Sequence, residues 1–527
     1  MKAYELASGV LRALSEAKEA RGMISVVNAH VSGISYMNLG DYGLEFLEDL
    51  AATGERVRVP TSSNPCGMDR ELWREQGISE DFAAKQARVN AALEKMGIAP
   101  TYSCTFPYEG QWSSKLKPGD HVAWAESSAV VYGNSVLGLR SNREGGPSAL
   151  FSGITGLTPN YGMHLDENRK PTVLIKVEQP IPRGPLEWGL LGKKIAELGE
   201  KAKVPYIYGL GRIATKGELK ALSAALATFG PTDMFLAPYL SPEASKEPPK
   251  LEEVTIDGRE LEEQSREALD KAVSGETPKA FFLGCPQYGV EELVYIARLL
   301  SDVKKVKGDI FIYTSRHAIS DQAGFQAVNS LREKGVKVFR DTCPVFSPAP
   351  SFSGGVMTDS VKSSFYMPQS KSIRPTLEPT VASFMLASGE LEGKRLTTYI
   401  GKAVVAGTAS GEAIVSYKPL SFLGGINPST GIVIDEESEL KGESVKGKVL
   451  VYPTGKGSTV GSYIIYAMKK MGTSPAAIIM READTVTIIG CVLAGIPLVH
   501  RVNPDPLEIK AGSMVRVADG TIEVTDR

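Results

Sequence analysis

The stretch GKVLVYPTGKGSTVGSYIIYAMKKMG, residues 447–472, joins two contrasting patterns. Residues 447–452 alternate and are rich in β-branched side chains, whereas residues 461–472 carry apolar side chains at helical spacing. The loop between them therefore connects a strand to a helix N-terminus, and its N–H groups, the helix dipole and Lys456 favour an anion close to Ser458. The phosphate-loop spacing G-x-x-x-x-G-K-[ST] is absent, so for this loop alone a capped turn is the preferred interpretation.

Strand and helix patterns also alternate through the middle of the chain, which predicts largely parallel sheets. Near residue 390 a polar segment gives way to a new β-rich pattern, where we place a domain boundary. The sequence thus predicts an α/β protein with mostly parallel sheets in residues 1–388 and a β-rich domain in residues 389–527. The expected strands lie in residues 172–178, 232–239, 279–286, 308–315 and 336–344, with helices in residues 217–230 and 290–303.

The charge balance excludes a strongly basic surface. Lys and Arg number 59 and Asp and Glu 61, a formal charge of -2, so we expect neither nucleic acid nor a membrane surface as a partner. No apolar run approaches the roughly 20 residues that span a bilayer, and residues 485–499 are interpreted as buried strand and turn. The first 22 residues show an amphipathic helix pattern without a signal-peptide core, and we expect a cytoplasmic protein.

Five cysteines are dispersed along the chain without a paired framework, as in a reducing compartment. Cys285 and Cys343 each precede a proline at the carboxyl end of an expected strand, where α/β folds place ligand-binding groups, and Cys104 lies in a similar polar turn. Three thiolates on rigid loops can hold an iron-sulfur cluster and leave one iron open to substrate. The alternative for any single cysteine is a small buried side chain, which we expect for Cys491.

Two polar loops can bind a carboxylate or a phosphate. Residues 59–69 end a strand in a polar run, and residues 141–169 combine charged side chains with glycine. Ordinary turns and caps explain such loops equally well, and both alternatives stay open here. The polar residues concerned are Thr61, Ser62, Ser63, Asn64, Asn142, Arg143, Glu144 and His164.

Taken together, these segments resemble the aconitase X family over essentially the whole chain. The large catalytic part of that family is similar to HVSGISYMNLGDYGLEFLEDL (residues 30–50), to both polar loops, and to LGCPQ, DTCP and FSGGVMTDS. Its small swivel domain is similar to GGINPSTG (residues 424–431), to the opening stretch and to residues 475–499.

The resemblance implies an aconitase-like hydro-lyase in which a swivel domain closes over an iron-sulfur cluster, 4Fe-4S with one open iron. It implies Cys104, Cys285 and Cys343 as cluster ligands and Ser458 as the catalytic base. The implied partner is a small hydroxy acid, and a homo-oligomer is left open. The implied substrate-binding residues are the eight polar loop residues together with Lys362, Lys456 and Gly457.

The family divides by substrate. Residues 32–50 are closer to the archaeal-type branch, which dehydrates (R)-5-phosphomevalonate to trans-anhydromevalonate 5-phosphate, and a phosphate suits the basic and glycine-rich loops. Bacterial members include enzymes that dehydrate cis-3-hydroxy-L-proline instead. Two departures stand out: the archaeal enzyme is usually two chains, and Cys66 lies in the first polar loop, as a further ligand, a reactive thiol or a small side chain.

An interpretation from another class is a catalytically inactive, iron-responsive binding protein. Retention of the three cysteines and of the serine loop argues against it, as does the neutral charge balance, which supplies no basic surface for RNA.

Overall fold

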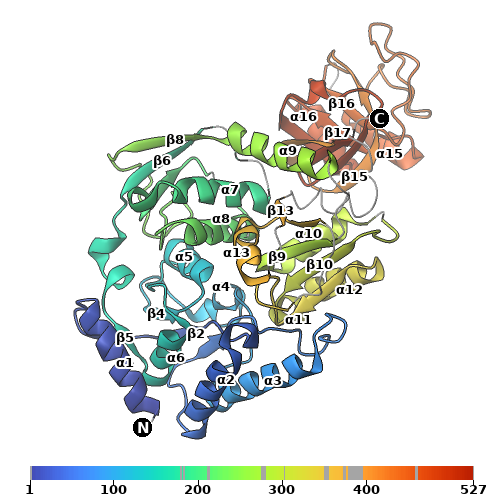
Figure 1. Ribbon diagram of the computed structural model, residues 1–527. Coiled ribbons are helices and arrows are strands. Elements are labelled where there is room, and N and C mark those ends of the chain that lie inside the picture. The colour runs from blue at the N-terminus through green and yellow to red at the C-terminus, as the bar shows by residue number, and fades with distance from the viewer. Residues whose placement is uncertain are drawn as a thin grey trace. The chain divides into compact units, whose positions relative to one another are not determined.

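Parallel sheets form the framework of the first of two units into which the chain divides, Met1–Gly389 and Glu390–Arg527 (Figure 1). One three-stranded sheet has β2 (Asn28–Val31) between β3 (Thr61–Ser63) and β4 (Val122–Trp124), all parallel. Their carboxyl ends therefore meet at one edge of the sheet. The computed structural model describes residues 3–178, 181, 184–210, 214–274, 280–301, 303–348, 355–371, 375–377, 396–456 and 461–525.

Helices with clear sequence signals surround this sheet. α3 (Glu80–Lys95) begins where the Ser79 side chain accepts the N–H of Phe82, and it carries acidic residues in its first turn. Residues 23–25 and residues 157–159 form a separate two-stranded antiparallel ribbon. The remaining elements of this region are α1 (Ala3–Ala17), α2 (Tyr36–Ala52), α4 (Phe106–Glu109), α5 (Ser127–Val136), α6 (Gly146–Thr155), β1 (Met23–Ser25) and β5 (Leu157–Pro159).

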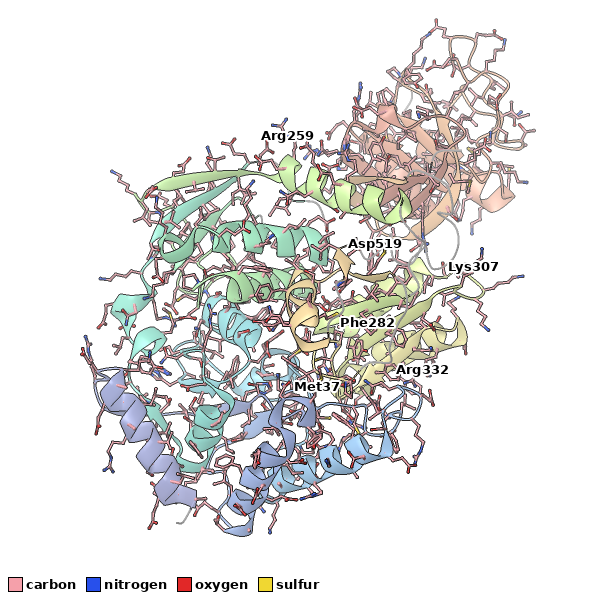
Figure 2. All side chains as sticks on the ribbon, in the orientation of Figure 1. Met37, Arg259, Phe282, Lys307, Arg332 and Asp519 are labelled. Carbon is pink, nitrogen blue, oxygen red and sulfur yellow. The ribbon has the colours of Figure 1, made fainter. Side chains whose placement is uncertain are left out.

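A five-stranded parallel sheet carries two of the cysteine segments. Its order is β11-β10-β9-β12-β13, with Cys285 near the end of β9 (Ala280–Tyr288) and Cys343 just after β11 (Lys337–Arg340). Phe282 stacks on Phe311 with ring centroids 5.0 Å apart, inside the core of this sheet (Figure 2). The other elements are β10 (Asp309–Thr314), β12 (Val356–Thr358), β13 (Thr376–Leu377), α10 (Val290–Leu299), α11 (Arg316–Ser320), α12 (Gln322–Glu333) and α13 (Val361–Lys371).

The third parallel sheet has the order β7-β6-β8. Residues 232–239, predicted to be a strand, contribute only a single bridge between Leu236 and Tyr206. That prediction was wrong, because Pro231 and Pro238 remove backbone donors on both sides of Leu236. The elements are β6 (Val173–Glu178), β7 (Pro205–Tyr208), β8 (Glu253–Asp257), α7 (Pro185–Ala196), α8 (Lys216–Phe229) and α9 (Gly258–Ser274).

The second unit is a closed barrel whose strands follow the order β14-β18-β17-β16-β15-β19-β20. The four central strands, β15 to β18, are parallel and the other pairs antiparallel. The fold class predicted from the sequence, parallel α/β followed by a β-rich region, is confirmed. The elements are β14 (Leu396–Val405), β15 (Thr408–Val415), β16 (Val449–Tyr452), α15 (Gly461–Met471), β17 (Ala477–Met480), α16 (Thr485–Ala494), β18 (Leu498–Asn503), β19 (Met514–Ala518) and β20 (Thr521–Thr525).

The interpretation of residues 485–499 as strand and turn was wrong for their first part. Asp484 caps α16 by accepting the N–H groups of Val486 and Thr487, and Gly495 ends it in the left-handed conformation with φ 60°. These end signals outweigh the β-branched composition, and only β18 is a strand. Within the described part of the chain, no helix combines the length and the apolar run that a membrane crossing requires. Short 3-10 turns lie at Ser113–Lys115, Gly162–His164, Asp166–Arg169, Gly199–Ala202 and Pro506–Glu508.

Candidate functional site

Three free thiols of the first unit, Cys104, Cys285 and Cys343, lie on neighbouring segments that Gln287 connects by hydrogen bonds. Burial, opposed by the Lys362 ammonium and assisted by the neighbouring Cys343, raises the pKa of Cys285 to about 12. Burial also raises the pKa of Cys104, to which Cys285 adds. The backbone N–H of Gln287 donates to Cys104 Sγ and that of Phe346 to Cys343 Sγ, both at 3.4 Å. Cys285 therefore lies within electrostatic reach of both other cysteines.

A buried ion pair lies beside these thiols. Lys362 Nζ, at the start of α13, is 2.5 Å from Glu126 Oε1, just after β4, and the two side chains are 13% and 11% exposed. Burial lowers the pKa of Lys362, but Glu126 and the thiols of Cys285 and Cys104 raise it above its ordinary value. One positive charge therefore faces the cysteines, and its counterion is already present.

Hydrogen bonds from the end of β3 and from the first turn of α5 hold Glu126. Asn64 Nδ2 donates to Glu126 Oε2 at 3.0 Å, and Ser128 Oγ donates to Glu126 Oε1 at 2.8 Å. Burial alone would raise the pKa of Glu126, but the Lys362 ammonium and these hydrogen bonds lower it to about 2. Glu126 is therefore an anion, and Asn64 is the residue of the first polar loop that reaches it.

The other residues of the first polar loop bind protein groups. Ser62 Oγ is 2.8 Å from His30 Nδ1, while His30 Nε2 is 3.1 Å from Asn64 Oδ1. Thr61 Oγ1 donates to Val59 O, and Ser63 Oγ donates to Ala99 O. Substrate binding by Thr61, Ser62 and Ser63 stays a prediction.

A cavity adjoins Cys285. It lies between Cys285 and the N-terminal half of α8, and its walls hold charged side chains of both signs. The residues lining it include Cys285, Tyr288, Asp359, Ser360, Lys362, Lys220 and Glu292.

The donor set fits an iron-sulfur cluster. The thiols lie on three separate segments, and N–H donors reach two of the sulfurs, as is common where thiolates bind iron. Among the described residues, no three His, Cys, Asp or Glu side chains converge as a single metal ion requires. A cluster binds each thiolate through a different iron and so accepts wider spacing. Gln287 Oε1 and Thr342 Oγ1, beside Cys285 and Cys343, are buried without a hydrogen-bond partner, and so is Ser363 Oγ in α13.

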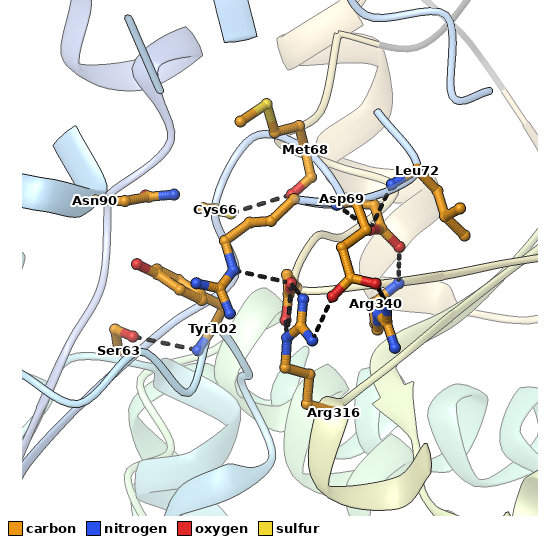
Figure 3. Close-up of polar contacts among 12 residues, drawn as sticks. Ser63, Cys66, Met68, Asp69, Leu72, Asn90, Tyr102, Arg316 and Arg340 are labelled. Atoms are coloured by element: carbon orange, nitrogen blue, oxygen red, sulfur yellow. Dashed lines mark hydrogen bonds and ion pairs between the residues drawn. The ribbon is translucent and has the colours of Figure 1, made fainter. Parts of the chain in front are cut away.

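Cys66 does not fit the role of a cluster ligand. Its thiol is fully buried and donates to Met68 O at 3.1 Å, and burial raises its pKa to about 12 (Figure 3). Next to it, the buried carboxylate of Asp341 pairs with Arg70 and Arg316. Of the three alternatives for Cys66, the structure favours a small buried side chain.

Residues 141–169 use their polar groups to hold the fold. The Arg143 guanidinium donates to the carbonyl oxygens of Ala227 and Gly230 at the end of α8 and pairs with Asp233. Asn142 Nδ2 donates to Tyr161 O, and Asn142 Oδ1 accepts the N–H of Met163. Substrate binding by this segment stays a prediction.

Two further side chains of that segment are also engaged. Burial raises the pKa of Glu144, which accepts hydrogen bonds from Ser148 and Thr158. His164 Nδ1 is 2.9 Å from His121 Nδ1, and burial lowers the pKa of His164 to about 3.

The glycine-serine loop belongs to the second unit. Gly457 and Ser458 lie outside the described residues. Lys456 Nζ is 3.0 Å from Asp435 Oδ2, and the Lys456 N–H donates to Leu420 O at 3.0 Å. The structure therefore describes the strand before the loop and the helix after it, and the role of Ser458 stays a prediction.

Three residues of the site were missed in the sequence. Glu126 directly follows a buried strand, Ser360 follows β12 and donates to Cys285 O, and Gln287 follows the Cys285-Pro286 pair. The first two share the position just beyond the carboxyl end of a parallel strand, a signal applied above only to cysteines and polar runs.

Comparisons with known proteins agree with this architecture. The sequence profile described as Aconitase X first domain matches residues 2–167, the second domain residues 171–266, the third domain residues 278–382 and the Aconitase X swivel domain residues 398–524.

Curated relatives match the two parts separately. A phosphomevalonate dehydratase large subunit from Methanocaldococcus jannaschii is 38% identical over 68% of this chain and 89% of its own length. A phosphomevalonate dehydratase small subunit from Thermococcus onnurineus is 54% identical over 24% of this chain and 97% of its own length. A cis-3-hydroxy-L-proline dehydratase from Hypocrea jecorina is 30% identical over 70% of this chain and 63% of its own length. All three names are those of dehydratases, and hence of hydro-lyases.

The crystal structure of Thermococcus kodakaraensis aconitase X in its holo form superposes with a TM-score of 0.64 at 33% identity, covering 74% of this chain and 95% of that one. The fold is thus that of an aconitase-type protein. The chain belongs to the aconitase X family.

Proposed function

We propose that this chain is an iron-sulfur-dependent hydro-lyase that dehydrates (R)-5-phosphomevalonate to trans-anhydromevalonate 5-phosphate. The observation that carries the proposal is the similarity of one chain to both subunits of phosphomevalonate dehydratase. Five archaeal large subunits are 36–38% identical to it, against 30% for the cis-3-hydroxy-L-proline dehydratase. Residues 1–388 then serve as the large-subunit part and residues 389–527 as the swivel domain.

Cys104, Cys285 and Cys343 would hold the cluster, proposed to be 4Fe-4S. When bound, the cluster supplies a Lewis acid for the departing hydroxyl group. Its binding requires thiolates, and the pKa of the buried Cys285 thiol lies near 12 in the free protein, so cluster binding must release protons. The N–H donors at Cys104 and Cys343 stabilise the resulting negative charge.

Lys362 and Asn64 bind and orient the substrate in this proposal. Lys362 supplies the positive charge for a carboxylate, and its pair with Glu126 keeps the ammonium in place until a substrate arrives. Asn64 has a side chain that bonds both His30 and Glu126 and is held in one orientation. A fixed orientation of this kind lowers the entropic cost of reaching the reactive geometry.

Ser458 would take the proton α to the carboxylate. A serine is a weak base, so its alkoxide needs stabilisation from the loop N–H groups, the N-terminus of α15 and Lys456. Lys456 is bound to Asp435 in the second unit, and that ion pair restricts where its charge can lie. The small-subunit likeness of this part of the chain supports the assignment.

A substrate panel tests the proposal. The protein is reconstituted anaerobically with iron and sulfide and incubated with (R)-5-phosphomevalonate or with cis-3-hydroxy-L-proline, with unsaturated product followed by NMR. We expect kcat/KM for 5-phosphomevalonate to exceed that for hydroxyproline by orders of magnitude. Turnover of hydroxyproline alone would overturn the substrate assignment and keep the reaction class.

A further inference from the structure

Gln287 is hydrogen-bonded to two of the three cysteine-bearing segments and belongs to the third. It is fully buried in β9, two residues after Cys285. Its backbone N–H donates to Cys104 Sγ at 3.4 Å, and its side-chain Nε2 donates at 2.9 Å to the carbonyl oxygen of Thr342, the residue before Cys343. A weaker contact of 3.5 Å joins Nε2 to Tyr102 O. A single side chain and its own backbone therefore tie the segments together.

Lys220 of α8 fixes Gln287 from the other side. Its ammonium, 1% exposed, donates to Gln287 O at 3.0 Å, lies 3.2 Å from Glu109 Oε1 and is ion-paired with Glu292. An ammonium has three N–H donors, and these three acceptors use all of them. Glu109 ends α4, the helix that follows Cys104, so Lys220 adds a second connection between the Cys104 and Cys285 segments.

A hydrogen bond also holds the turn that follows Gln287. Glu292 Oε2, in the first turn of α10, accepts the N–H of the N-cap residue Gly289 at 2.7 Å. A carboxylate and an ammonium buried together resist displacement, because moving either one leaves the other charge without a partner. The position of Gln287 is thus set by charges that the protein cannot easily rearrange.

We propose that Gln287, fixed by Lys220, is a positioning residue that sets the spacing of the Cys104, Cys285 and Cys343 thiols for the cluster. Neighbouring groups that orient metal ligands strongly affect how tightly a metal is held. The inference rests on the cluster of the proposed function, and it assigns a role to the glutamine of the LGCPQ stretch.

The test compares two buried glutamines. Gln287→Met keeps the length of the side chain and removes both polar atoms. Gln86→Met is the matched control, because Gln86 is equally buried but its Nε2 donates to Ile34 O and Asn90 Oδ1. Iron and sulfide per chain are measured after anaerobic reconstitution, together with the rate of iron release to a ferrous chelator and the electron paramagnetic resonance spectrum of the reduced protein.

We expect iron release from Gln287→Met to be roughly 10- to 100-fold faster than from wild type, with an altered spectrum. Gln86→Met should release iron at the wild-type rate even if its melting temperature falls. Gln287→Asn keeps the amide but shortens its reach, and should give an intermediate rate.

Iron release at the wild-type rate from both Gln287 variants would overturn the inference. Loss of the fold in both, measured by circular dichroism without iron while Gln86→Met folds, would also overturn it and make Gln287 a residue of the core. A wild-type protein that binds no iron and sulfide would instead overturn the cofactor assignment of the proposed function.

Discussion

Two regions of the first unit that hold candidate site residues differ in how the fold uses their polar side chains. Beside Cys285, Lys362 lines a cavity and pairs with the buried carboxylate of Glu126. In residues 141–169, by contrast, Arg143 and Asn142 have their hydrogen bonds taken by backbone carbonyl and N–H groups. No residue of 141–169 lines that cavity. A polar segment after a strand therefore indicates a site only where its side chains reach a cavity, because backbone groups elsewhere compete for the same side chains.

The largest expected effect is at the cysteines. Cys104→Ser, Cys285→Ser or Cys343→Ser should each abolish the brown colour and the activity, since each removes one of three thiolate ligands. The measurements are the visible absorption after reconstitution and the dehydration rate. Cys491→Ser is the control: Cys491 lies in the core of the barrel unit, so this change should cost stability and leave the cluster. If the wild-type protein were colourless and still fully active in the presence of an iron chelator, the cluster assignment would be wrong.

Separating the two parts of the chain should have the next largest effect. Fragments 1–388 and 389–527 correspond to relatives that occur as separate subunits, so each should fold. Either fragment alone should be inactive, and a mixture should regain activity. Turnover by fragment 1–388 alone would show that the barrel unit is not required.

Breaking the Lys362–Glu126 pair should lower the free energy of unfolding moderately and the dehydration rate strongly. Lys362→Met leaves a carboxylate buried without its counterion, which costs about 3 kcal/mol, and kcat/KM should fall as well. Lys337→Met is the control, because the Lys337–Asp309 pair is 46% and 48% exposed and its loss should cost under about 1 kcal/mol. Unchanged kcat/KM in Lys362→Met would exclude Lys362 from substrate binding.

Arg143→Met tests residues 141–169, the second region of the comparison, and should have the smallest effect on catalysis. Losing the hydrogen bonds to the end of α8 and the pair with Asp233 should cost about 2 kcal/mol of unfolding free energy. KM should stay at the wild-type value. A tenfold rise in KM with unchanged stability would mean that Arg143 binds substrate and that the two regions act together.

The sequence predicted the fold class well because periodicity and end signals are local. Helices such as α3 and α8 carry Ser79 and Thr215 as caps, and strands β9 and β10 contain the apolar runs of residues 280–283 and 310–313. Residues 485–494 were misjudged because composition was weighed above the Asp484 cap and Gly495.

The site was less predictable, because its contacts join distant parts of the chain. The Cys-Pro pairs indicated Cys285 and Cys343 through their place at strand ends, whereas the partnership of Glu126 with Lys362 spans 236 positions. No local pattern shows such a pairing. Gln287 was passed over for the same reason: its partners Cys104, Thr342 and Lys220 lie on three other segments.

The most direct test of the central claim follows proton removal at the carbon next to the carboxylate. Reconstituted wild-type protein is incubated with (R)-5-phosphomevalonate in deuterated water, and exchange of the α-hydrogen is measured by NMR beside product formation. Ser458→Ala is compared with Ser462→Ala, where the lost hydroxyl donates to Val486 O at 2.9 Å and only stability should fall. We predict exchange in the wild type and in Ser462→Ala, and none in Ser458→Ala. Exchange that persists in Ser458→Ala would contradict the account and move the base to another residue, with His164 and Lys362 the next to test.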